Sequence, residues 1–94
     1  MASKMDQLAQ NAPAGETVKE ALTHFVPRLT DADATALAVL FTQEGASNRR
    51  EILEVVRFQR GCTVMTRGLA RHPPIPILSL VRLQHFVEAA NSCV

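Results

Sequence analysis

Apolar side chains recur every three or four residues through most of this 94-residue chain, and this helical spacing limits its fold more than any other feature. No stretch of useful length alternates apolar and polar residues, as a half-buried strand does. Thirteen alanines add to the preference for helix over sheet. The sequence therefore predicts an all-α fold: a helical hairpin with flanking short helices, which pairs with a second copy as a dimeric helical bundle.

The length of the chain predicts a single domain. We expect residues 1–14 to form a mobile N-terminal tail, closed by Pro13 and Gly15, and residues 15–94 to form the helical domain. A domain this short buries only about 60% of the surface of its unfolded chain, so its stability is marginal and self-association is a common remedy. This reasoning favours a homodimer.

Proline and capping residues mark the ends of the first two helices. The first is expected over 16–26, where Pro27 stops it because the residue before a proline disfavours the helical conformation. The second is expected over 31–44, directly after Thr30, which has the character of an N-cap. Acidic residues in the first turn of this second helix suit the positive end of the helix dipole.

Gly45 forms the next break, and Asn48 followed by Glu51 resembles a capping box. A long helix is expected over about 49–70, followed by a proline-rich connector and a last helix over about 77–91. The apolar positions of the last helix, again at helical spacing, are Leu80, Leu83, Val87 and Ala90.

Two opposite faces of the long helix differ in chemistry. One is an apolar seam at alternating spacings of three and four, as in a coiled coil: Val55, Phe58, Cys62, Met65 and Leu69. The other is cationic: Arg50, Arg57, Arg60, Arg67 and Arg71. The seam is explained either by packing within the domain or by a partner surface. The arginines form either a solvated face or a site for carboxylate or phosphate.

Interruptions of this pattern constrain the long helix further. Leu53, Val56 and Val64 break the cationic face, so part of that side must also be covered. Gly61 and Gly68 each cost about 1 kcal/mol relative to alanine. They mark either a close approach between helices or an early end near Gly68.

We expect the helices to be held by a core of Leu37, Phe41, Val55, Phe58, Leu80 and Leu83. The exposed remainder of the apolar surface, rimmed by arginines, would bind a partner, because apolar anchors and arginine dominate binding hot spots. Cys62 is either a buried small apolar residue or half of an intersubunit disulfide. The candidate residues for partner binding or the dimer interface are Val55, Phe58, Cys62, Met65, Leu69, Arg57, Arg60, Arg67 and Arg71.

Catalysis and metal binding lack a signature in the sequence. No GxSxG, phosphate-binding glycine loop, HExxH or CxxC motif occurs, and the three histidines show no i,i+4 pairing. We therefore expect no enzyme, with no catalytic residue, cofactor or metal ligand. No run approaches the roughly 18 apolar residues of a membrane span, and residues 1–15 lack the apolar core of a secretory signal. A cytoplasmic protein without membrane contact is expected.

Charge is unevenly distributed about a total of +1: residues 1–47 carry −3 and residues 48–94 carry +4. A helix-turn-helix-like DNA-binding regulator is the main alternative function, because Ser47-Asn48-Arg49-Arg50 opens the helix that follows the glycine break. The near-neutral total weighs against it, as do inward positions that fall on or near Glu51 and Glu54. A secretion chaperone or phage accessory protein is a further alternative.

Three features together resemble the small cytoplasmic helical anti-activators of quorum sensing of the QslA type. They are a glycine-broken hairpin over 37–58, an arginine-rich helix that continues to Arg71, and a last helix after a proline-rich connector. The resemblance covers about residues 16–94. It implies a homodimer that docks on the ligand-binding domain of a LuxR-type transcriptional activator, separates the subunits of that activator and blocks its binding to DNA. On this basis we expect a regulatory protein that inhibits by protein–protein interaction.

Overall fold

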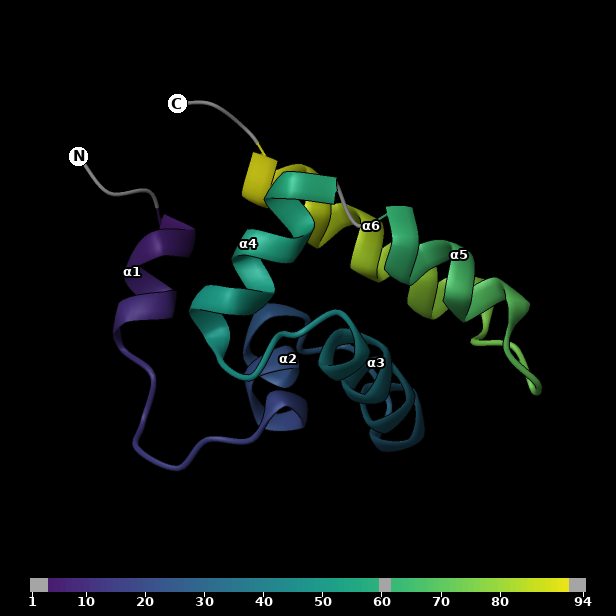
Figure 1. Ribbon diagram of the computed structural model, residues 1–94, viewed down its shortest axis with the longest axis horizontal. Coiled ribbons are helices and arrows are strands. Elements are labelled where there is room, and N and C mark those ends of the chain that lie inside the picture. Colours follow the sequence, from purple (N-terminus) through teal and green to yellow (C-terminus); the bar gives the residue numbers. More distant parts are fainter. Residues whose placement is uncertain (1–3, 60–61, 92–94) are drawn as a thin grey trace.

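The computed structural model describes residues 4–59 and 62–91. Every regular element in these residues is a helix, which confirms the predicted all-α class (Figure 1). The helices are α1 (Lys4–Gln10), α2 (Val18–Phe25), α3 (Asp31–Gln43), α4 (Arg49–Gln59), α5 (Cys62–Ala70) and α6 (Ile77–Asn91).

Local capping begins both α2 and α3. The sequence predicts the cap of α3, whereas it places the start of the first helix two residues early, at residue 16. The Thr17 hydroxyl accepts the backbone N–H of Glu20 at 3.1 Å, and the Glu20 carboxylate accepts the backbone N–H of Thr17 at 3.1 Å. This reciprocal capping box begins α2, which ends two residues before Pro27. Thr30 Oγ1 accepts the backbone N–H of Asp33 at 3.2 Å, which confirms Thr30 as the N-cap of α3.

A Schellman turn ends α3. Gly45 has a φ of +90°, a left-handed conformation that glycine adopts without a Cβ clash. The Ala46 N–H donates to the Phe41 carbonyl and the Gly45 N–H donates to the Thr42 carbonyl, each at 3.0 Å. Ala46 is buried directly after the turn.

The two helices on either side of this turn diverge. α3 packs mainly against α2 and α5, whereas α4 packs mainly against α1 and α6 (Figure 1). The predicted hairpin therefore reduces to a turn at Gly45. The helices on either side of it pack mainly against other helices and not against each other. Longer-range pairings of this kind, between segments far apart in the chain, bring α4 beside both the first and the last helix.

The single long helix predicted over 49–70 is wrong, because α4 ends at Gln59 and α5 begins at Cys62. The two axes point in different directions (Figure 1). Each helix packs against different neighbours: α4 contacts α1 and α6, and α5 contacts α3. The buried apolar side chains of α4 are Ile52, Leu53 and Val56, none of which belongs to the predicted apolar seam. The prediction that the side with Leu53 and Val56 must also be covered is confirmed.

The segment predicted as a mobile tail contains α1. Met5, Leu8 and Ala9 of this helix are partly buried against the core. Isolated helices of this length are unstable in water, so packing against α4 must hold α1 in its helical form. The apolar face of this segment is short, and the helix that covers it, α4, lies some fifty residues later in the sequence. The sequence pattern of residues 4–10 alone therefore does not predict the helix.

The core is one continuous cluster of buried apolar side chains, to which all five helices from α2 to α6 contribute. Phe25 of α2 stacks on Phe86 of α6, with ring centroids 4.8 Å apart. Val55 is only half-buried, and Phe58 is 89% exposed, so the assignment of Phe58 to the core is wrong. The predicted core is confirmed for Leu37, Phe41, Leu80 and Leu83.

The last helix has the predicted bounds, and its four predicted apolar positions are buried. Gly68 of α5 lies against the start of this helix. A Cβ atom at Gly68 would lie 3.2 Å from side-chain carbons of both Ile75 and Leu80. Gly68 therefore marks a close approach between helices, which is one of the two roles that the sequence suggested.

Candidate interaction surface

Phe58 is the most exposed large apolar side chain in the described part of the chain. It lies two residues after the buried Val56, and two residues correspond to about 200° of rotation around a helix. The same turn of α4 that buries Val56 therefore directs Phe58 toward solvent. A single exposed apolar side chain is common on protein surfaces, whereas an apolar patch rimmed by polar residues indicates a binding site, and Phe58 lies at such a patch together with Val55.

A hollow of about 250 Å³ lies beside Phe58. A second, more open hollow of about 530 Å³ adjoins it and is lined by Glu54, Arg57 and Phe58. We call the six residues that line the first hollow the Phe58 surface; they are Glu44, Gly45, Glu51, Glu54, Val55 and Phe58.

Three carboxylates border the apolar part of the Phe58 surface. Glu44 forms an ion pair with Arg67, with an N–O distance of 3.0 Å. Glu51 Oε1 accepts hydrogen bonds from the Ser47 hydroxyl and from the Ser47 backbone N–H, the latter at 2.9 Å. These hydrogen bonds lower the pKa of Glu51 below its ordinary value, so its charge persists into mildly acidic solution. Glu54 is exposed and makes no hydrogen bond or ion pair with the described residues.

The predicted apolar seam does not form one continuous stripe. Val55 and Phe58 meet at the Phe58 surface, at the end of α4. Met65 and Leu69 belong to α5, where Met65 packs partly against the core and Leu69 is 53% exposed. The side chain of Cys62 lies outside the described residues, and with it the prediction of its burial or its intersubunit disulfide.

The arginines also separate into different environments. Arg57 forms an ion pair with Asp6 at 2.7 Å and donates to the Ala90 carbonyl at 2.9 Å, so it joins α4 to α1 and α6. Arg67 pairs with Glu44, whereas Arg71 is exposed. Arg60 lies outside the described residues. Among the described residues, the structure therefore places three carboxylates around Phe58, with Arg57 lining the adjoining hollow and Arg67 paired with Glu44.

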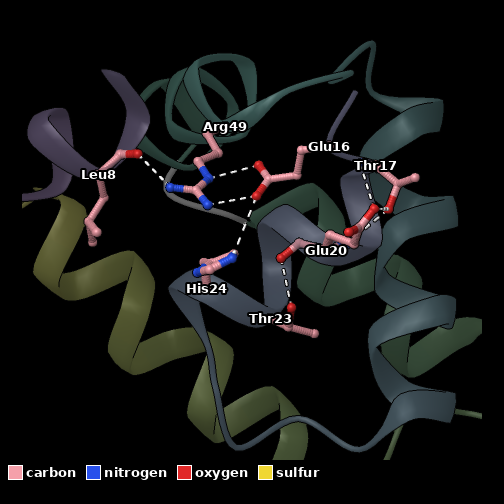
Figure 2. Close-up of polar contacts among 7 residues, drawn as sticks. All are labelled: Leu8, Glu16, Thr17, Glu20, Thr23, His24 and Arg49. Carbon is pink, nitrogen blue, oxygen red and sulfur yellow. Dashed lines mark hydrogen bonds and ion pairs between the residues drawn. The ribbon is translucent and has the colours of Figure 1, made fainter. Parts of the chain in front are cut away.

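Sequence reasoning missed Arg49, which positions the helix that carries the Phe58 surface. Its side chain is buried with that of Glu16, and the two form a bidentate pair with N–O distances of 2.7 and 2.6 Å (Figure 2). A third hydrogen bond runs from Arg49 to the Leu8 carbonyl at 2.8 Å, and His24 lies 3.7 Å from Glu16. The hydrogen bond with Glu16 raises the pKa of the Arg49 guanidinium. The burial of Arg49 could have been predicted from its position, because it lies one turn before the apolar Ile52, on the buried face of α4.

The opening of α4 is occupied by contacts within the chain. Ser47 holds Glu51, and Asn48 Oδ1 accepts the backbone N–H of Glu51 at 3.0 Å. The predicted capping box therefore forms in a modified way: Asn48 accepts the backbone N–H of Glu51, but the Glu51 carboxylate accepts the backbone N–H of Ser47 instead of that of Asn48. Arg49 is buried, which leaves Arg50 as the exposed arginine of the tetrapeptide that suggested DNA contact.

The described residues hold no group of three or more potential metal-ligating side chains, and none of their helices has the length and hydropathy of a membrane span. Comparison of the chain with protein-family models, with curated proteins and with solved structures finds no match. The functional conclusion therefore depends on the geometry and charge of the Phe58 surface.

Proposed function

We propose that this chain is a non-catalytic interaction protein that binds another protein through the Phe58 surface. The observation that supports this proposal is the 89% exposure of Phe58 beside a hollow of about 250 Å³. Fully burying such a side chain contributes roughly 1.5–3 kcal/mol relative to leaving it exposed. Because Phe58 is not buried in the core, this free energy does not stabilise the fold and can instead contribute to binding when a partner covers the side chain.

The surroundings of Phe58 suit an anchoring role. Val55 offers adjoining apolar surface, and charged groups surround the pair. An apolar anchor within a polar rim is the usual anatomy of a protein interface, in which a few buried aromatic side chains carry much of the binding free energy. The buried Arg49–Glu16 pair fixes the start of α4, and Arg57 ties its last turn to α1 and α6, so the backbone that carries Phe58 loses little conformational entropy when a partner binds.

The proposal includes a regulatory partner. The resemblance to anti-activators of the QslA type makes a LuxR-type transcriptional activator the first partner to test, with its ligand-binding domain as the docking target. Binding there would prevent dimerisation of the activator and hence its binding to DNA. A pull-down with the purified ligand-binding domain tests this step, and Phe58→Asp should abolish an interaction that uses the Phe58 surface.

The proposal also includes self-association. A second apolar surface, which we call the Leu78 surface, lies at the start of α6 and consists of Ile77, Leu78 and Val81. Its members are spaced so that they share one side of the helix, and all three are exposed. We assign the homodimer contact to the Leu78 surface, which leaves the Phe58 surface for a different protein.

Site-specific photo-crosslinking tests the use of the Phe58 surface. p-Benzoylphenylalanine replaces Phe58 in one variant and the exposed Ala89 of α6 in a control variant. After irradiation in lysate of the source organism, we expect a discrete covalent adduct from position 58 and none from position 89. Mass spectrometry then identifies the partner. Absence of an adduct from position 58, or the same adducts from both positions, would contradict the proposal.

A further inference from the structure

The side chains around Phe58 predict the chemistry of what binds there. Glu44, Glu51 and Glu54 all line the same hollow as the apolar pair Val55 and Phe58. A partner that fills this hollow brings its own side chains within reach of three carboxylates. Charges buried at an interface without partners are costly, so the partner must supply compensating groups.

The carboxylates differ in how they are engaged within the chain. Glu44 is paired with Arg67, whereas Glu54 is exposed and makes no hydrogen bond or ion pair within the described residues. Both contacts from Ser47 reach Oε1 of Glu51, so its Oε2 accepts no hydrogen bond from those residues. Glu54 and one oxygen of Glu51 therefore remain available to donors from outside.

We infer that the Phe58 surface receives a basic, amphipathic segment of another protein, which places an apolar side chain against Val55 and Phe58 and lysine or arginine beside Glu51 and Glu54. This inference rests on the proposed function and adds the charge of the partner to it. A cavity of about 150 Å³ is enough for a benzene-sized group, so a hollow of about 250 Å³ accommodates one apolar side chain.

A second copy of the chain suits the Phe58 surface less well. In a two-fold symmetric interface the same patch meets itself, so Glu51 and Glu54 of one copy would lie close to those of the other, whereas Glu44 is already paired with Arg67. Juxtaposed like charges disfavour such a contact. The same carboxylates repel the phosphates of nucleic acid, whose binding depends on positive charge. Of these occupants, a basic polypeptide segment is the one that the charges favour.

The overall charge of the chain makes the inference testable with simple probes. The total is +1, so non-specific attraction does not favour a cationic ligand. We use two fluorescein-labelled helical peptides of fourteen residues with leucines at the same positions and either lysine or glutamate at all others. Fluorescence anisotropy at low ionic strength should show binding of the lysine peptide and none of the glutamate peptide.

Two substitutions locate this binding. Glu54→Lys should weaken binding of the lysine peptide by about tenfold, because a favourable ion pair becomes a repulsion. The matched control is Glu88→Lys on α6, which makes the same change of charge beside a different hollow and should leave the affinity unchanged. Phe58→Asp should abolish binding. Neither Glu54 nor Phe58 is buried, so circular dichroism should show that both variants remain folded.

Several results would overturn the inference. Among them are failure of the lysine peptide to bind, equal affinity for the glutamate peptide, and equal losses from Glu54→Lys and Glu88→Lys. Crosslinking from position 58 separates this failure from failure of the proposed function. An adduct with an acidic segment of another protein retains the proposed function and overturns the inference. An adduct with a second copy of this chain overturns the inference as well.

Discussion

Arg49 joins three parts of the chain through one side chain. Its guanidinium holds Glu16, which precedes α2, and the carbonyl of Leu8 in α1, while its own backbone begins α4. A buried ion pair of this kind need not add more stability than apolar residues of similar shape. We expect it to favour one arrangement of the three segments, because within the described residues Arg49 pairs with no carboxylate but Glu16, and His24 lies farther from Glu16, at 3.7 Å.

Arg49→Met should lower the free energy of unfolding by about 3–5 kcal/mol, because it leaves the Glu16 carboxylate buried without its partner. Adding Glu16→Gln should recover much of this loss, since the double variant buries no unpaired charge. Urea denaturation followed by circular dichroism measures both effects.

The exposed pair Lys19–Asp31 provides the control for this experiment. Lys19→Met removes a cation of similar size and should change the free energy of unfolding by less than about 1 kcal/mol, since solvent screens the pair. Equal effects of Arg49→Met and Lys19→Met would show that burial of the Arg49–Glu16 pair has no special consequence.

At the scale of single residues, the sequence predicts best where the relevant partner is nearby. Thr30 and Asn48 each accept the backbone N–H of the residue three positions ahead, and their types and positions indicate those roles. Glu16 and Arg49 are 33 residues apart, and only the fold brings them together. The apolar pair Val55 and Phe58 was identified from its spacing, whereas the carboxylates that border it come partly from the end of α3.

The sequence likewise predicts best those helices whose ends are determined by nearby residues. α2, α3 and α6 have ends set by caps, glycine or proline, and the sequence predicts them closely. α1 depends on contact with α4, and the separation of α4 from α5 accompanies packing against different neighbours. The spacing of apolar residues continues across that separation, so periodicity alone describes both as one helix.

The approach of α5 to α6 gives a prediction at this scale. Gly68→Leu should lower the free energy of unfolding by about 1–3 kcal/mol, because a side chain there overlaps Ile75 and Leu80. The better helix propensity of leucine offsets about 1 kcal/mol of the strain. Thermal or urea denaturation measures the difference from the wild type.

Ala70→Leu is the control, because Ala70 is an exposed residue of the same helix. Its effect should stay within about 0.5 kcal/mol, as for most surface substitutions. If Gly68→Leu also left the unfolding midpoint unchanged, the contact between α5 and the start of α6 would not restrict the size of this residue.

The Phe58 surface and the Leu78 surface lie in different parts of the fold, the first around α4 and the second at the start of α6. Carboxylates border the Phe58 surface. The Leu78 surface consists of three apolar side chains at the start of α6, beside a proline-rich connector. A chain of 94 residues has little core with which to offset such exposure. Because the carboxylates around Phe58 disfavour contact with the same surface of a second copy, we assign the Phe58 surface to a different protein and the Leu78 surface to the second copy.

Sedimentation velocity at micromolar concentration tests this division. The chain should sediment as a dimer of 10.3 kDa subunits, Leu78→Asp should convert it to a monomer, and Phe58→Asp should leave the dimer intact. A charge placed in an apolar interface has no partner there, which is why one substitution should suffice. A wild-type protein that sediments as a 10.3 kDa species would exclude the homodimer, and dissociation by Phe58→Asp alone would reverse the two assignments.

The turn at Gly45 has a consequence for how binding specificity can change. Gly45 lines the hollow, but its positive φ and its place in the hydrogen bonding that ends α3 restrict it to glycine. Glu54 and Phe58 are exposed side chains on the outer face of a helix, and neither position requires an unusual backbone conformation. Substitutions at those two positions can therefore accumulate over generations with little effect on folding, so that related chains could share this scaffold while recognising different proteins.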